Sequence, residues 1–232
     1  MAALSLVFLP PGGGDVSGWG PPMEALSKRY KSLAVDMPGA GSQRASKFLN
    51  TIEECAAYAE GALWASGLQN VVLMGFSMGG LIAQCMALRG PQAYRGLVLV
   101  ATAARIKIAQ QVLDALRADP AAARRMIQQS THNPNLRQQA ATGASNPEAL
   151  HAYLNATNSY DAREQIKQIA IPTLIAHGDV DNVCPQRFAE SVHQSIAGSQ
   201  FKLFKGAGHE LPREFPQELT SAIEEFLGRL AR

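Results

Sequence analysis

The chain has 232 residues, of which 47% are hydrophobic and 17% are charged, and its formal net charge at pH 7 is +2. That length suffices for one well-buried domain with room for an inserted cap. The small net charge, without a long basic run or a basic aromatic patch, excludes nucleic acid as an expected partner. The longest apolar runs are of strand length, so we expect no membrane span.

The N-terminal segment 1–9 is apolar and ends at Pro10-Pro11-Gly12. Because it lacks the basic start of a signal peptide, we interpret it as a strand. The cysteines Cys55, Cys85 and Cys184 are widely spaced and form neither a CxxC pair nor a Cys/His cluster. This pattern argues against a disulfide framework and against zinc, and it favours free buried thiols in a reducing compartment. We therefore expect a cytoplasmic protein without a bound metal.

Short apolar runs alternate along the chain with amphipathic segments of helical length. The expected strands are Leu4–Leu9, Ser32–Asp36, Asn70–Met74, Gly96–Ala101, Pro172–His177 and Gln200–Phe204. The expected helices are Pro22–Tyr30, Thr51–Ser66, Met78–Arg89, Gln186–Ile196 and Phe215–Leu230. This alternation predicts the α/β class, with a mainly parallel sheet of about six strands flanked by helices. In such sheets, functional residues lie in loops at the carboxyl ends of the strands.

The segment 105–169 interrupts this alternation, because it has no strand pattern. Asp119-Pro120, Asn133-Pro134 and Asn146-Pro147 each join a good N-cap residue to a proline suited to the first helical position. We expect four short helices, at 108–118, 120–130, 134–144 and 147–157. They predict a helical cap after the fourth strand, inserted into a core formed by residues 1–104 and 170–232. The alternative, one long irregular crossover, is disfavoured by the three repeated helix starts.

The segment around Ser77 carries the strongest motif. A strand-like run ends in Gly75-Phe76-Ser77-Met78-Gly79, which is a Gly-x-Ser-x-Gly pattern, and an apolar helical segment follows at once. A serine at such a strand-to-helix turn is held at an exposed corner, and the glycines allow strand and helix to pack closely around it. We interpret Ser77 as a nucleophile, which needs a neighbouring base to react at neutral pH. A chance match is the alternative, but the flanking strand and helix disfavour it.

His209 is the candidate general base. It follows the last expected strand in the glycine-rich loop Lys205-Gly206-Ala207-Gly208, which allows its side chain to reach across the strand ends. A positioned imidazole accelerates proton transfer by about 10²–10⁴-fold. The other histidines fit less well: we interpret His177 as a hydrogen-bonded structural residue and expect the remaining three on the surface, namely His132, His151 and His193.

Two carboxylates, Asp179 and Asp181, follow the fifth expected strand. One of them should accept the imidazole N–H, which fixes the tautomer and stabilises the imidazolium. We prefer Asp181, because it lies further into the loop. Asp179 would then brace the loop by accepting backbone N–H groups. Spacing alone leaves the choice between the two open.

The first strand ends at Leu9, where an oxyanion hole is expected. Pro10 and Pro11 have no N–H to donate, so the first available amide is that of Gly12. A second donor is expected from the N–H of Met78, directly after the nucleophile and at a helix N-terminus. A phosphate cradle is disfavoured because neither GxxxxGK[ST] nor GxGxxG is present, and no cofactor is expected.

The order Ser77, Asp181, His209 resembles that of the α/β-hydrolase superfamily, and the resemblance covers nearly the whole chain. The segment 35–42 is similar to the superfamily's Asp-x-x-Gly-x-Gly-x-Ser segment, and 172–185 to its Pro-Thr-Leu-x-x-x-Gly-x-x-Asp-x-x-x-Pro segment. The match implies the α/β-hydrolase fold, assigns the acid to Asp181 and gives Gly12 the oxyanion position. The chain departs from the pattern where Pro10-Pro11 replaces the usual His-Gly.

The cap resembles that of small carboxylesterases, including pimeloyl-carrier-protein methyl ester esterases and enol-lactone hydrolases. The candidate residues and this resemblance together predict a serine hydrolase that cleaves carboxylic esters through an acyl-enzyme. Charged recognition residues are not evident, which favours small or medium neutral or apolar acyl esters, and we expect a monomer or homodimer. Alternatives on the same residues are a thioesterase, a lactonase, a C–C hydrolase or a ligand sensor with little turnover. The residues expected to line an acyl pocket are Trp19, Leu113, Met126, Leu150, Tyr153 and Leu211. For each cap residue among them, packing between cap helices is the alternative.

Overall fold

The computed structural model describes residues 3–43, 45, 47–119, 121, 125, 136 and 146–231 of the chain. Its strands are β1 Ser5–Leu9, β2 Lys31–Ala34, β3 Val71–Phe76, β4 Tyr94–Val100, β5 Thr173–Gly178 and β6 Gln200–Phe204. Its α-helices are α1 Pro21–Ser27, α2 Ile52–Ser66, α3 Met78–Arg89, α4 Gln110–Ala118, α6 Pro147–Ser159, α7 Gln186–Ser195, α8 Leu211–Glu214 and α9 Pro216–Leu230. Short 3-10 helices are η1 Val16–Trp19, η2 Pro91–Ala93 and η4 Gln165–Gln168.

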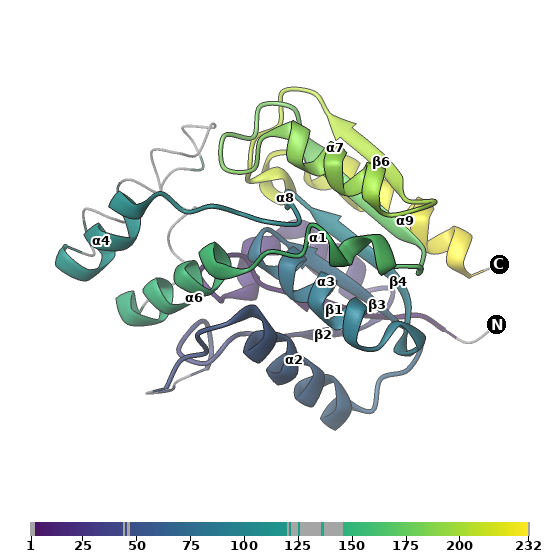
Figure 1. Ribbon diagram of the computed structural model, residues 1–232. Helices are drawn as coiled ribbons and strands as arrows, with labels where there is room; N and C mark the ends of the chain where they lie inside the picture. Colours follow the sequence, from purple (N-terminus) through teal and green to yellow (C-terminus); the bar gives the residue numbers. More distant parts are fainter. Residues whose placement is uncertain are drawn as a thin grey trace.

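The six strands form one parallel sheet in the order β2-β1-β3-β4-β5-β6 (Figure 1). This confirms the predicted parallel sheet of six strands. Because every strand runs the same way, all their carboxyl ends lie at one edge of the sheet. The strand order reverses direction at β1, which pairs with β2 on one side and β3 on the other. Loops at such a reversal open a crevice at the strand ends.

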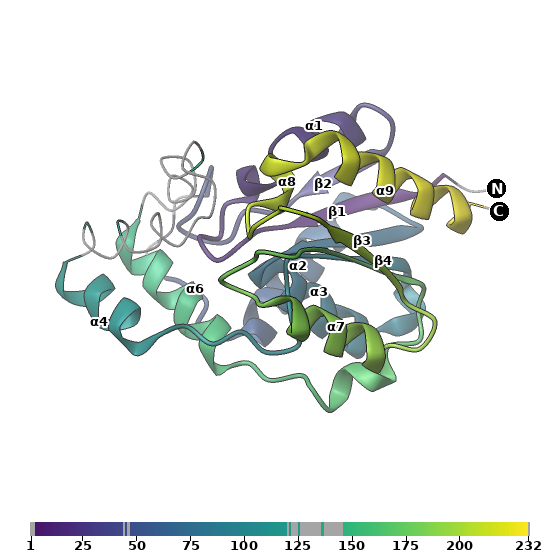
Figure 2. The same cartoon turned by 90° about the horizontal axis from the view of Figure 1, so that it is seen from above.

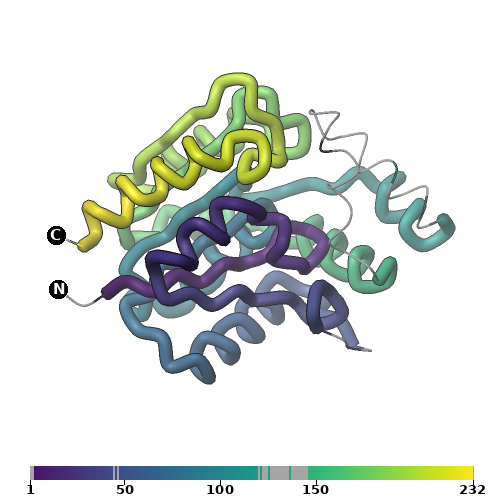
Figure 3. The backbone as a smooth tube through the Cα atoms, turned by 180° about the vertical axis from the view of Figure 1, so that it is seen from behind, coloured from purple at the N-terminus to yellow at the C-terminus, as the bar shows by residue number. Residues whose placement is uncertain are grey.

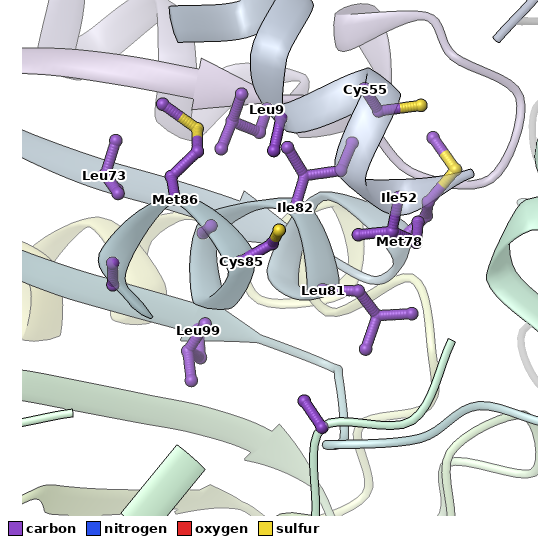
Figure 4. Close-up of a cluster of buried hydrophobic side chains, with 14 of the residues drawn as sticks. Leu9, Ile52, Cys55, Leu73, Met78, Leu81, Ile82, Cys85, Met86 and Leu99 are labelled. Carbon is purple, nitrogen blue, oxygen red and sulfur yellow. The ribbon is translucent and has the colours of Figure 1, made fainter. Parts of the chain in front are cut away.

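Helices cover both faces of the sheet. In Figure 2, α1 and α9 lie on one face, and α2, α3 and α7 lie on the other. Figure 3 shows α1 and α9 side by side from behind. Two-sided coverage explains why the central strands are apolar without alternation: Leu6 and Phe8 of β1 pack toward α9, whereas Val7 and Leu9 pack toward α3. Around α3 the core is aliphatic and sulfur-rich, with Ile82 and Met86 at its centre (Figure 4).

Local sequence signals explain the helix limits. Thr51 caps α2 by accepting from the N–H of Glu54 at 3.1 Å, and Gly67 ends it in the left-handed conformation at φ 66°. Asn146 caps α6 by accepting from the N–H groups of Glu148 and Ala149. Among the helices that the structure describes, none is long and apolar enough to cross a membrane.

The two outer helices expected in the segment 105–169 correspond to α4 and α6, which pack against each other at the end of the molecule away from both termini (Figures 1 and 2). The helices expected at 120–130 and 134–144 lie outside the described residues. Helix α6 is tied to the core, because the Tyr153 hydroxyl donates to the carbonyl of Pro38. Among the described residues, α4 buries Leu113 and Leu116 in a small cluster shared with α6.

Candidate active site

Ser77 lies at the sharp turn between β3 and α3, with φ 53° and ψ −117°. A positive φ is unfavourable for a residue with a side chain, so the surrounding packing must hold it there. Gly75 and Gly79 allow this packing. A Cβ on Gly75 would lie 2.4 Å from the carbonyl oxygen of Gly79, and one on Gly79 would lie 2.4 Å from that of Leu9. The two glycines of the motif therefore allow the backbone to pack closely on both sides of Ser77, where a side chain would not fit.

The backbone of Ser77 is held by β4 and the residues after it. Its N–H donates to the carbonyl of Val100 at 2.9 Å, and its carbonyl accepts from the hydroxyl of Thr102 at 2.8 Å. Thr102 is buried. The sequence analysis did not identify Thr102, because a single threonine after a strand carries no signal of such a role.

The side chains of Ser77, His209 and Asp181 form a continuous hydrogen-bonded chain. Ser77 Oγ lies 2.9 Å from His209 Nε2, and His209 Nδ1 lies 2.8 Å from Asp181 Oδ2. A carboxylate only accepts, so Nδ1 carries the proton and Nε2 is left to accept from the serine hydroxyl. The structure thus brings together the three residues predicted as nucleophile, base and acid, from β3, β6 and β5 respectively. A hydroxyl in this arrangement can transfer its proton as it attacks.

The loop after β5 holds the acid in place. Asp181 is buried, and its Oδ1 accepts from the N–H groups of Val183 and Cys184, both at 2.8 Å. Asp179 does not contact His209 in this chain of bonds. Its Oδ1 accepts instead from the N–H of Gly206 at 2.7 Å, which ties the acid loop to the loop before His209. This is the bracing role considered for Asp179 in the sequence analysis.

Glu214 of α8 holds the base loop from the other side. Its Oε2 accepts from the N–H of Gly208, directly before His209, at 2.6 Å. The neighbouring Arg213 donates to the carbonyl of Ser17 at 3.0 Å. Helix α8 therefore links the loop of the base to η1, which follows the predicted oxyanion loop. Sequence analysis missed Glu214, since charged residues near a histidine are common and usually solvated.

The charges of this site reinforce one another. Burial alone would raise the pKa of Asp181, but the attraction of His209 and the hydrogen bonds it receives hold that pKa below its ordinary value. Burial opposes a charged His209, yet the Asp181 carboxylate holds the pKa of His209 above its ordinary value. The pair is thus arranged to favour an imidazolium beside a carboxylate, which is the ion pair that forms when the histidine accepts a proton.

The predicted oxyanion donors lie in suitable elements. Met78 is the first residue of α3, and none of the described residues accepts a hydrogen bond from its N–H or from that of Gly12. The loop is shaped by the N–H of Gly14, which donates to the carbonyl of Pro11 at 2.8 Å. The contact between Gly79 and the carbonyl of Leu9 brings the start of this loop against the first turn of α3. Both amides lack an acceptor among the described residues.

The described residues among those predicted to line an acyl pocket are all buried. Trp19 is completely buried in the core beside Phe8 and Phe76, and its indole N–H donates to the carbonyl of Leu9 at 2.9 Å. It supports the end of β1, just before the predicted oxyanion loop, and presents no surface to a ligand, which corrects the role expected for it. Leu211 is also completely buried in the core, on the α9 face of the sheet.

The described residues of the segment 105–169 that were predicted to line the pocket are buried as well. Leu113 and Leu150 pack in the α4–α6 cluster, as the alternative interpretation expected, and Tyr153 is completely buried. Met126 lies outside the described residues. A residue not predicted, Leu154 of α6, lies over the oxyanion loop, because a Cβ on Gly12 would be 2.9 Å from its Cδ2.

Asp181, Cys184 and His209 are the group of possible metal ligands found within the described part of the chain, with ligand atoms within 4.8 Å of one another. Two of them already share a hydrogen bond. Burial raises the pKa of the Cys184 thiol well above its ordinary value, which opposes the thiolate that a metal requires. The set therefore suits proton transfer better than metal binding.

Comparisons with known proteins place the chain among hydrolases. A family model described as serine aminopeptidase, S33, matches residues 4–216. A pimeloyl-[acyl-carrier protein] methyl ester esterase from Neisseria meningitidis is 29% identical over 224 residues, covering 84% of each chain. The crystal structure of a hydrolase from Pseudomonas aeruginosa PA01 superposes with a TM-score of 0.86 at 25% identity, covering 97% of this chain and 90% of that one.

An enol-lactonase from Burkholderia xenovorans LB400 has a TM-score of 0.85 at 24% identity, covering 98% of this chain and 92% of that one. At that identity the likeness shows the fold alone. Together the comparisons confirm the predicted α/β-hydrolase fold and the predicted resemblance to esterases.

Proposed function

Because this chain belongs to the hydrolase family described as serine aminopeptidase, S33, we propose that it cleaves carboxylic esters with Ser77 as its nucleophile. The observation that carries this proposal is the hydrogen-bonded chain from Ser77 through His209 to Asp181. The esterase named among its relatives supports an ester as the substrate rather than a peptide. We assign the roles of base and acid to His209 and Asp181.

In the proposed reaction, Ser77 Oγ attacks the ester carbonyl while its proton passes to His209 Nε2. Asp181 stabilises the imidazolium through its bond to Nδ1. Collapse of the tetrahedral intermediate transfers that proton to the leaving alcohol and leaves an acyl-enzyme on Ser77. A water molecule then gives a proton to Nε2 and attacks the acyl carbon, which releases the acid and restores Ser77.

We assign the stabilisation of the oxyanion to the N–H groups of Gly12 and Met78. Both amides lack an acceptor among the described residues, and Met78 adds the positive end of the α3 dipole. A donor of this kind contributes about 10²–10³-fold to turnover. The rigid support of Trp19 beneath Leu9 would keep this loop in register with Ser77.

We further propose that the segment 105–169 acts as a cap over residues 1–104 and 170–232 and selects the acyl group. The contact of Leu154 with Gly12 supports this, because it brings α6 to the loop where the ester carbonyl would lie. The apolar character of the α4–α6 cluster favours small or medium neutral acyl groups. We expect a monomer or homodimer, and a cytoplasmic location in view of three free buried thiols.

The test is a series of p-nitrophenyl esters of increasing acyl length, together with an aminoacyl p-nitroanilide, a thioester and a lactone. We expect the native chain to hydrolyse short and medium aryl esters fastest. Ser77→Ala should lose about 10⁴-fold or more in kcat while keeping the native circular dichroism spectrum. Ester hydrolysis that survives Ser77→Ala would contradict the serine mechanism. Tight retention of an ester without turnover by the native chain would contradict the enzyme and favour a sensor.

A further inference from the structure

His177 is a completely buried histidine at the carboxyl end of β5, four residues before the proposed acid. Its Nε2 lies 2.7 Å from the carbonyl oxygen of Cys184 and 3.7 Å from Asp181 Oδ2. Because a carbonyl oxygen only accepts, Nε2 must carry the proton and donate it. Its Nδ1 is buried and has no hydrogen-bond partner among the described residues. The ring is thus aimed at the acid loop through one nitrogen.

The partner of His177 is also a partner of Asp181. The carbonyl of Cys184 accepts from His177, while the N–H of the same residue donates to Asp181 Oδ1 at 2.8 Å. The two contacts hold Cys184 on both sides. The residue after it is Pro185, which has no N–H and offers the loop no further donor. His177 is therefore the side chain that links the rigid end of β5 to Cys184, whose N–H, together with that of Val183, orients the carboxylate.

The charge of His177 affects how the Asp181 carboxylate pairs with His209. Burial lowers its pKa, and the attraction of Asp181 opposes that effect only in part. The other charged groups that act on it are His209 and Glu190 of α7. A neutral ring leaves the Asp181 carboxylate free to pair with His209, whereas a charged ring would compete with His209 for the same oxygen, Oδ2.

We propose that His177 is a positioning residue, which acts through Cys184 to fix the Asp181 carboxylate toward His209. This inference rests on the proposed function of the site and adds a residue that does not touch the reacting atoms. An apolar side chain of similar volume would fill the space but leave the buried carbonyl of Cys184 without a donor. The loop would then relax, and an error of about 1 Å in such a constellation costs up to about 10²-fold in rate.

The first experiment compares two replacements of similar size. His177→Gln places an amide N–H where Nε2 of the ring lies, and His177→Met offers no donor. We expect His177→Met to lose about 10- to 100-fold in kcat on an aryl ester, with KM changed less than about threefold. His177→Gln should stay within about threefold of the native chain. A serine-directed fluorophosphonate titration counts the active sites, so that unfolded protein does not mimic the effect. Native kcat in His177→Met, or equal losses in both variants, would overturn the proposal.

The second experiment asks whether the effect passes through the acid. If it does, His177→Met should cost almost nothing in an Asp181→Asn background, because the carboxylate it orients is already gone. A loss that multiplies with that of Asp181→Asn would show a separate structural role and contradict the proposal. In the single variant, the acid limb of kcat/KM should move to lower pH, because a loosened Asp181 raises the pKa of His209 less.

Two further variants separate a failure of the proposed function from a failure of the role proposed for His177. If His177→Met does not fold, His177→Asn replaces it, since its shorter amide lies near Nδ1 and cannot reach the carbonyl of Cys184. If Ser77→Ala retains full esterase activity, the proposed function fails. If Ser77→Ala is inactive while His177→Met and His177→Asn are fully active, only the role of His177 fails.

Discussion

The strand ends and the segment 105–169 are built by different kinds of contact. At the strand ends, Ser77, His209 and Asp181 are joined by directional hydrogen bonds at 2.8–2.9 Å, and further bonds fix the loops behind them. In the described part of the segment 105–169, α4 and α6 meet mainly through four buried leucines, to which Arg117 Nε adds a hydrogen bond to His151 Nε2 at 2.9 Å near the surface. Directional bonds require particular residue types at particular positions. A leucine cluster can instead be formed by other aliphatic side chains of similar volume. Motifs therefore identify the proposed catalytic residues but not those that select the substrate.

The largest effect on activity is expected from Asp181→Asn, which removes the proposed catalytic acid. Asp179→Asn, in the same loop, is its matched control. We expect Asp181→Asn to lower kcat by about 10³–10⁴-fold, because the amide no longer fixes the Nδ1–H tautomer or stabilises the imidazolium. Asp179→Asn keeps a carbonyl that can accept from the N–H of Gly206, and should lose less than about tenfold. Steady-state kinetics on one aryl ester measures both. Equal losses of kcat in the two variants would contradict the assignment of Asp181, rather than Asp179, as the acid.

The same variant makes a prediction for pH. His209 must be neutral to accept the serine proton, so kcat/KM falls as the pH drops through its pKa. Asp181 holds that pKa above its ordinary value, and removing its charge should shift the acid limb to lower pH. A limb that stays in place in Asp181→Asn would show that another group controls it.

The fold was predictable because its signals are local and repeated. Most strands of the sheet are short apolar runs, and a helix such as α2 is bounded by local signals, the Thr51 cap and Gly67. The nucleophile was predictable for a similar reason, since the strand, the glycines and the following helix lie within about a dozen residues of Ser77. His209 and Asp181 needed topology as well, because only a parallel sheet brings the ends of β5 and β6 to the same edge.

A second challenge concerns the elbow itself and compares two glycines in helices. Gly79→Ala would place a Cβ 2.4 Å from the carbonyl oxygen of Leu9, whereas Gly61→Ala on α2 meets nothing within 4 Å. We expect Gly79→Ala to lower the free energy of unfolding by about 3 kcal/mol or more, because the added Cβ cannot fit unless the backbone of β1 or α3 moves. Gly61→Ala should raise it by about 0.5–1 kcal/mol. Urea unfolding of both variants provides the measurement, and an unaffected Gly79→Ala would refute the close packing around Ser77.

The supporting residues were not predictable from a single sequence. Thr102, Glu214 and Trp19 each form one contact with the backbone near the site, across a distance in sequence that no local pattern records. Trp19 was assigned to a ligand pocket because large apolar residues near a site suit both roles. Its complete burial and its bond to Leu9 depend on how η1 folds back under β1, which is a property of tertiary packing.

A third challenge tests one of these supports. Thr102→Val keeps the shape of the side chain but removes the hydroxyl that donates to the carbonyl of Ser77. Because that carbonyl loses one of its two donors, we expect a loss of about 0.5–1.5 kcal/mol in the free energy of unfolding. The decrease in kcat should be no more than about tenfold, since the carbonyl also accepts from the N–H of Gly80 at 2.9 Å. Unchanged stability in urea would mean that Thr102 is dispensable to the elbow.

The smallest expected effect is a change in KM, and it compares two leucines of the segment 105–169. Leu113 and Leu154 belong to the same cluster, but Leu154 also lies over Gly12. Leu154→Ala should therefore raise KM for medium-chain esters by about tenfold while leaving KM for the acetate ester nearly unchanged. Leu113→Ala, which removes the same atoms from α4, should change neither KM by more than about threefold. Among the described residues, the leucines of α4 are buried in a cluster with those of α6. We therefore expect Leu113→Ala to shift thermal unfolding little, because α4 can open without disturbing the sheet. Equal KM effects in the two variants would mean that the acyl group is recognised by the cluster as a whole and not by the edge of α6.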